Sequence, residues 1–207
     1  MSASIDTGHI SKISNQIQLI QMFLKPEKQN KTKNNIDLRL IETISDLFLN
    51  ICDKSNLQDT NLNLNIQKFF ISTIVPSISI KDYLIRLVQL TRMEESSLIF
   101  IVIYIDRFCS FNHIKLTHNN IHKLILTSMF IAIKFNEDKH YSLEIYAKIG
   151  GVSPQELKSM EFYFLVFIQF NLNVDTNLYQ EYHNYLESFQ EDEEYSGENE
   201  SDKNGDD

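Results

Sequence analysis

Two histidines of this 207-residue chain have a spacing that could bind a metal ion. His118 and His122 are four residues apart, so on a helix their imidazoles would share one face, as in helical zinc sites. No cysteine or glutamate stands nearby at the spacing of a further ligand. The pattern therefore favours polar residues at the start of a helix, and we expect neither a metal ion nor a cofactor.

Residues for catalysis are equally scarce. Cys52 and Cys109 lie outside any C-x-x-C motif, and Cys109 follows an apolar stretch, which indicates a core thiol rather than a nucleophile. No paired carboxylates and no nucleophile–base pair stand out. The only adjacent glycines are Gly150 and Gly151, so glycine-rich phosphate-binding loops are excluded. The sequence predicts a protein that is not an enzyme.

Four charged residues at the ends of, or inside, apolar stretches are better candidates for a function: Asp106, Arg107, Lys134 and Glu161. If Asp106 is buried it must pair with a cation, because an unpaired buried carboxylate is costly. If it lies at a solvated helix end, it needs no partner. For Lys134 and Glu161 the alternatives are a contact with another molecule and a solvated or snorkelling charge.

Helical patterns must position these charges. Apolar periodicity, length and capping residues predict helices at residues 36–52, 78–92, 94–111, 119–136, 142–149, 153–171 and 177–189. Residues 98–105 have high β propensity, but their flanks extend the segment as a helix. Ser153, Pro154 and Glu156 form a helix start with a capping box. We expect a compact all-α bundle of five or six helices, with one helix surrounded by the others.

The charge of the chain is concentrated at its C-terminus. Residues 187–207 hold ten acidic residues and one lysine, whereas residues 1–186 hold 18 acidic and 18 basic residues. A neutral domain without a basic cluster argues against nucleic-acid binding. We expect a polar, largely disordered segment at 1–35, a folded domain at 36–186 and a disordered acidic tail at 187–207.

The segment 1–35 has two features of its own. Residues 25–33 carry four lysines around Pro26, which is typical either of a nuclear-targeting patch or of a solvated linker, and Glu27 favours the linker. Isoleucines at helical spacing are compatible with a short amphipathic helix: Ile10, Ile13, Ile17 and Ile20. No signal peptide is evident, and the longest apolar run has eight residues, short of the ~20 that span a bilayer. We expect an intracellular protein, in the nucleus or the cytoplasm, that binds no membrane.

Several of these segments, in this order, resemble the cyclin box. They are residues 104–108 (YIDRF), 133–137 (IKFNE) and 159–161 (SME). Residues 76–87, 122–135 and 146–157 are similar to the P/U-type cyclins, a branch named after a yeast phosphate-signalling cyclin. The resemblance covers about residues 36–180. It implies a single cyclin box, a five-helix bundle around a central buried helix at 121–135, with flanking N- and C-terminal helices.

The resemblance also implies a function. The chain would be a non-catalytic subunit that forms a 1:1 heterodimer with a cyclin-dependent protein kinase and activates it by packing on its mobile active-site helix. Lys134 and Glu161 would reach the kinase backbone, and Asp106 and Arg107 would be a structural motif of the box. The apolar neighbours that would pack on the kinase helix are Ile131, Phe135, Leu165, Phe170 and Leu172. The spacing of Glu161, Leu165 and Leu172 predicts that one helix face holds all three.

The sequence leaves alternatives for the charge partner of Asp106, for the cellular role and for the class of function. The arginine that usually partners the position of Asp106 is missing, and Arg86 is a candidate replacement. Roles in the cell cycle and in phosphate signalling both occur in the family. The alternatives to a kinase regulator are a cyclin-fold transcription-associated protein, a small helical enzyme and a helical scaffold unrelated to kinases.

Overall fold

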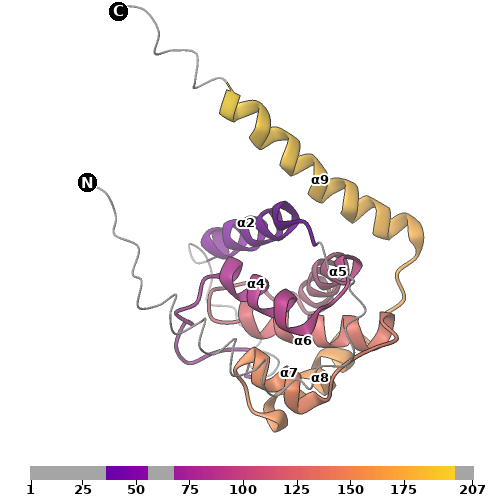
Figure 1. Ribbon diagram of the computed structural model, residues 1–207. Helices are drawn as coiled ribbons and strands as arrows, with labels where there is room; N and C mark the ends of the chain where they lie inside the picture. The colour runs from indigo at the N-terminus through magenta and orange to yellow at the C-terminus, as the bar shows by residue number, and fades with distance from the viewer. Residues whose placement is uncertain (1–35, 56–67, 199–207) are drawn as a thin grey trace, which may run out of the picture.

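The structure is a computed structural model that describes residues 36–55 and 68–198 (Figure 1). Within these residues it contains no strand, which confirms the all-α prediction, and seven helices, more than the five or six expected. The helices are α2 (Leu38–Ser55), α4 (Ile80–Thr91), α5 (Glu95–Asn112), α6 (Ile121–Asn136), α7 (Leu143–Gly150), α8 (Pro154–Phe167) and α9 (Thr176–Glu198).

Helix α6 is the centre of the bundle. Twelve of its sixteen residues are buried, and it packs against α4, α5 and α8. Figure 1 shows α6 between α4 and α5 on one side and α7 and α8 on the other. Ser128 and Ala132, which are small and four residues apart, are fully buried, so neighbouring helices can approach closely there. The predicted central helix is confirmed.

Helix α5 contains the segment whose β propensity competed with its helical length. Nine of its eighteen residues are buried, so packing on several sides stabilises the helix despite the β-branched side chains. It ends at His113, whose φ of 52° is left-handed and whose N–H binds the carbonyl of Cys109. The prediction of a helix over residues 94–111 is confirmed to within a residue at each end.

Helix α8 begins as predicted and ends earlier. The Ser153 hydroxyl accepts a hydrogen bond from the Glu156 N–H at 3.1 Å, and Pro154 occupies the first turn. The Glu156 carboxylate pairs with Lys123 Nζ at 2.9 Å, so it does not close the predicted capping box. The helix was expected to reach residue 171 but stops at Phe167, because Gln169 and Phe170 both take left-handed backbone angles with φ of 55°.

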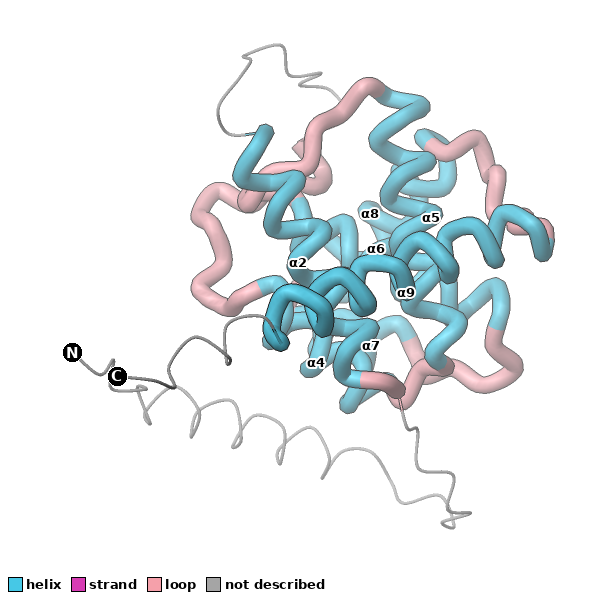
Figure 2. Tube along the Cα trace, turned by 90° about the horizontal axis from the view of Figure 1, so that it is seen from above, coloured by secondary structure: helices cyan, strands magenta, loops and turns pink. Residues whose placement is uncertain are grey.

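Helix α9 is longer than the sequence indicated. Its end was predicted at residue 189, yet it continues to Glu198, into the acidic segment. Glutamate is a good helix former, so the run of acidic residues does not by itself end a helix. Figure 2 shows α9 crossing over α2 and α5, the two helices that it contacts. None of the helices described is long and apolar enough to cross a membrane.

The two histidines at metal-binding spacing have separate partners. His118 Nε2 lies 2.9 Å from Asp53 Oδ1. His122 is buried and its Nε2–H donates to the carbonyl of Ile78 at 3.0 Å. In the described part of the chain no group of three or more His, Cys, Asp or Glu side chains could hold a metal ion. His122 therefore joins α6 to the segment before α4, and His118, which precedes α6, contacts α2.

The buried His122 should make stability depend on pH. Burial lowers its pKa below the usual 6.5, so between the two values the unfolded chain binds more protons than the folded one. We expect the free energy of unfolding to fall as the pH drops below about 6.5. His122→Gln, whose amide can still donate to Ile78, should reduce this slope. Urea denaturation of both proteins between pH 5 and 8 measures it, and equal slopes would contradict the assignment.

Candidate partner-binding surface

The structure brings the two charged residues singled out in the sequence into contact. Lys134, in the last turn of α6, forms an ion pair with Glu161 of α8. The lysine side chain is 40% exposed and the glutamate 16%. Lys134 Nζ also lies 4.9 Å from the centre of the Phe130 ring. The ion pair is therefore partly exposed to solvent. The Lys134 ammonium group is held from two sides, by the Glu161 carboxylate and by the Phe130 ring.

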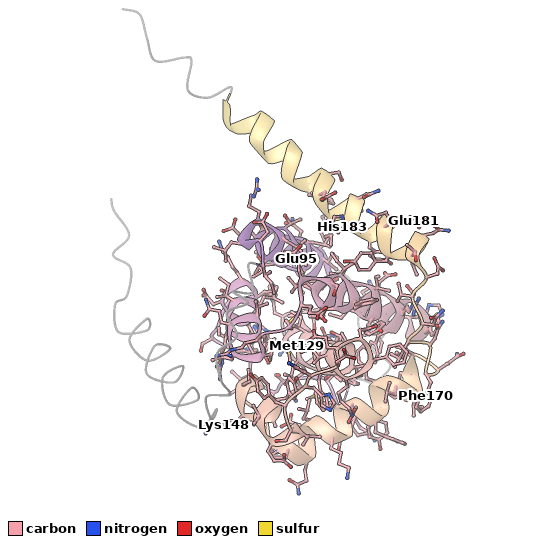
Figure 3. The ribbon with its side chains drawn as sticks, turned by 45° about the vertical axis from the view of Figure 1, so that its right-hand side comes forward. Glu95, Met129, Lys148, Phe170, Glu181 and His183 are labelled. Atoms are coloured by element: carbon pink, nitrogen blue, oxygen red, sulfur yellow. The ribbon has the colours of Figure 1, made fainter. Side chains whose placement is uncertain are left out.

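Two phenylalanines singled out in the sequence are exposed. Phe135 follows Lys134 and is 56% exposed, and Phe170, just after α8, is 63% exposed. Figure 3 shows Phe170 at the periphery of the molecule, whereas Met129 of α6 lies at its centre. Phe135 stands in the last turn of α6, where the neighbouring helices no longer cover it.

The other predicted residues complete this surface, which we call the α6–α8 face. Leu165 and Leu172 are half-buried, and Ile131 of α6 is almost fully buried. Leu165 is on α8, but Leu172 lies beyond its end, so the prediction that one helix face holds Glu161, Leu165 and Leu172 is wrong. The face consists of Lys134, Phe135, Glu161, Leu165, Phe170 and Leu172, on the end of α6, on α8 and on the loop that follows it.

Two exposed apolar side chains of α8 were not predicted. Phe162 is 58% exposed and Val166, one turn later, is also exposed. The buried positions of the helix are Leu157, Met160 and Phe164, which recur every three to four residues. Phe162 and Val166 are four residues apart and do not belong to this buried stripe. Their helical spacing outside the stripe is the sequence pattern that could have predicted their exposure.

The loop after α8 has an unusual backbone that sets the position of Phe170. The N–H of Phe170 donates to the carbonyl of Leu165 at 2.8 Å, and that of Gln169 to Val166 at 3.0 Å. A left-handed conformation costs a bulky residue about 1–2 kcal/mol, and neither residue is glycine. Contacts from elsewhere must therefore hold this turn.

Helix α5 supplies those contacts. The Tyr104 hydroxyl donates to the carbonyl of Leu172 at 3.0 Å, and Arg107 Nη1 donates to the carbonyl of Asn171 at 2.8 Å. Tyr104 and Arg107 are one turn apart, so they reach neighbouring carbonyls of the same loop. Asn112 Nδ2 donates to the carbonyl of Phe167 at 3.2 Å. These side chains position the loop that carries Phe170.

Of the two environments considered for Asp106, buried beside a cation or exposed to solvent, the structure shows the exposed one. It is exposed, and its Oδ2 accepts a hydrogen bond from the Tyr182 hydroxyl of α9 at 2.7 Å. Burial and this carboxylate together raise the pKa of Tyr182. The hypothesis of a buried Asp106 paired with a cation is wrong, because the residue faces α9 at the surface. Arg86 lies instead beside Tyr83 and Gly150, where it lines another cavity.

A family model and several known proteins are similar in sequence to this chain. A family model described as Cyclin matches residues 14–172. The chain is 33% identical to Cyclin-U2-1 of Arabidopsis thaliana over 114 residues, 55% of this chain and 51% of that protein. It is 36% identical to Cyclin-U4-3 of the same plant over 135 residues, 63% of this chain and 62% of the relative. The PHO85 cyclin-like protein psl1 of Schizosaccharomyces pombe is 34% identical over 139 residues, 66% of this chain and 57% of the yeast protein. The chain thus spans about half to three fifths of the length of these relatives.

Proposed function

Since this chain belongs to the cyclin family, we propose that it is the regulatory subunit of a cyclin-dependent protein kinase and that it binds the kinase through the α6–α8 face. We infer that α4 to α8 form a single cyclin box within a domain at residues 36–186, with α2 and α9 as the flanking helices. The observation that carries the proposal is the ion pair of Lys134 and Glu161, which joins α6 to α8, together with the exposure of Phe135 at the end of α6 and of Phe170 just after α8. The name of the fission-yeast relative favours a PHO85-type kinase.

The α6–α8 face suits a binding surface for a mobile helix. Exposed phenylalanines beside half-buried leucines offer apolar area that a partner would remove from water. Aromatic side chains at the centre of an interface contribute much of its binding energy. Charged groups at such a site set the orientation and register of the partner.

The ion pair is already formed in the free chain, which matters for binding. Each charge restricts the other, so less side-chain freedom remains to be lost when the partner arrives. An ammonium group has three donors and a carboxylate has about four acceptor positions. After pairing with each other, Lys134 and Glu161 can still donate to a carbonyl and accept from an N–H. These are the groups that the kinase backbone would present.

Activation follows from the requirements of a kinase. The active site needs a lysine of strand β3 paired with a glutamate of the mobile helix. A subunit that binds only the inward position of that helix shifts the equilibrium toward the active state. We propose that this chain acts in that way as an intracellular, non-catalytic partner in a 1:1 complex.

The direct test is co-expression with each cyclin-dependent kinase of the source organism, followed by purification through a tag on the chain. We expect one stable complex of equal stoichiometry and higher phosphorylation of a model peptide than by the kinase alone. Failure of every kinase to co-purify would refute the proposed function.

Truncation of the charged pair should weaken kinase binding selectively. Loss of a hydrogen bond to a charged group costs about 1.5–3 kcal/mol, so Lys134→Ala and Glu161→Ala should each lower affinity by roughly ten- to a hundredfold. The free chain should lose less than about 1 kcal/mol, because the pair is half-solvated. Calorimetry of binding and thermal melts of the free variants measure the two effects.

The matched control is another ion pair. Lys81 Nζ lies 2.7 Å from Glu42 Oε1, joining α4 to α2, and both side chains are about half exposed. Lys81→Ala removes a lysine ion pair outside the α6–α8 face and should leave affinity unchanged. Full affinity in the Lys134→Ala, Glu161→Ala double variant would exclude these two residues from the binding surface.

A further inference from the structure

A second surface, separate from the α6–α8 face, is a cavity of about 610 Å³ between α2, α5 and α9. Its size falls within the range of about 300–1,000 Å³ that is typical of binding pockets. We call it the α2–α9 groove. Its walls are mainly apolar, from Leu47, Phe48, Ile51, Val102, Ile105, Ile114, Leu116, Tyr182 and Tyr185.

Exposed apolar side chains rim this groove. Ile51 of α2 and Tyr185 of α9 are exposed, and the Tyr185 ring stacks edge-on against the exposed Phe189, with 4.9 Å between ring centres. Apolar patches that continue from a cavity onto the surface commonly mark binding sites. The groove therefore has the character of a docking site for an apolar segment.

Its surroundings are acidic. Asp106 and Glu181 line the groove alongside Lys115. Glu181 lies near the start of α9, at the periphery of the molecule (Figure 3). Beyond the groove α9 continues through residues 187–198, where the sequence has six acidic residues and no basic one. The segment that fits would combine apolar side chains with nearby positive charges.

The chain itself contains such a segment. Residues 10–20 carry four isoleucines at helical spacing, and residues 25–33 carry four lysines. We propose that the α2–α9 groove binds the chain's own residues 10–33, with the isoleucines in the groove and the lysines along the acidic part of α9. The family model begins at residue 14, ahead of α2, so most of this segment belongs to the region that the family shares.

The connection is long enough. The N–H of Asp37 donates to Glu95 Oε2 at 3.1 Å, which anchors the chain at the start of α5. The groove begins at Leu47, nine residues into α2 and so about 14 Å along that helix. Residues 25–35 can extend by up to about 36–40 Å. They can therefore carry residues 10–20 back along α2 into the groove.

Hydrogen–deuterium exchange of the full chain, read by mass spectrometry, tests the proposal independently of kinase binding. We expect the amides of residues 10–24 to exchange at least about tenfold more slowly than in a free peptide of the same sequence. Ile51→Asp and Tyr185→Asp, made separately, should each remove this protection while the amides of α6 stay protected. Phe162→Asp, which places the same charge on α8, should leave residues 10–24 protected.

Three results would overturn the proposal. In the first, residues 10–24 exchange as fast as the free peptide, which leaves the groove to another molecule. In the second, the protection survives in the Ile51→Asp, Tyr185→Asp double variant, which places the segment elsewhere. In the third, the protection depends on protein concentration and sedimentation gives the mass of a dimer, which means that a second copy supplies the segment.

Discussion

Phe170→Ala is expected to weaken kinase binding by about thirtyfold to several hundredfold, because truncation of an aromatic residue that anchors an interface costs about 2–4 kcal/mol. The side chain is 63% exposed in the free chain, so most of its burial would come from the partner. The turn that holds it is tied to α5, which keeps the ring in one place before the partner arrives. Calorimetry of the purified kinase with each variant gives the affinity.

Two further variants make the test specific. Phe189→Ala removes an exposed phenylalanine of α9 and should leave kinase affinity unchanged. Phe170→Gly removes the same ring but suits the left-handed backbone, so the free chain should unfold at a higher temperature while affinity falls as in Phe170→Ala. Wild-type affinity in Phe170→Ala would remove this residue from the interface.

Phe164→Ala should destabilise the free chain by about 3–5 kcal/mol, the usual cost of deleting a buried phenylalanine. Its ring is fully buried and stacks on Phe108 of α5 with 4.8 Å between ring centres, and Phe70 lies against its edge. The alanine would leave a cavity between α8 and α5 that rigid helices cannot close. Urea denaturation, followed by circular dichroism, measures the change in the free energy of unfolding.

The control stands two residues away on the same helix. Phe162 is 58% exposed, so Phe162→Ala should change the free energy of unfolding by less than about 0.5 kcal/mol. The two variants differ only in which face of α8 loses its ring. Equal destabilisation by both would mean that α8 does not pack on α5 through Phe164.

The elements of the fold were predictable where the signal was local. Length and flanking residues correctly identified α5 as a helix despite its β-branched core, and Ser153 and Pro154 marked the start of α8. The end of α8 was not predictable, because Gln169 and Phe170 are left-handed without a glycine to indicate it. The hydrogen bonds that hold this turn come from side chains of α5, more than sixty residues earlier in the chain.

The residues of the candidate surface were proposed from the sequence, but their arrangement could not be predicted from it. Lys134 and Glu161 drew attention because each is a charge among apolar neighbours. Their contact with each other joins residues 27 positions apart, and no local pattern encodes it. The contact of Asp106 with Tyr182 spans 76 positions and was missed for the same reason.

One turn of α5 has contacts on two sides of the molecule. Tyr104 and Arg107 hold the loop of Phe170, and between them Asp106 binds Tyr182, which lines the α2–α9 groove. A molecule in the groove and a kinase on the α6–α8 face would therefore act on the same few residues. If they do, their affinities are linked, and the factor by which one ligand changes the other must be equal in both directions. Measurement of kinase affinity with the Tyr182→Phe variant would detect this linkage. An affinity equal to that of the wild-type chain would show that the groove and the α6–α8 face are not energetically coupled.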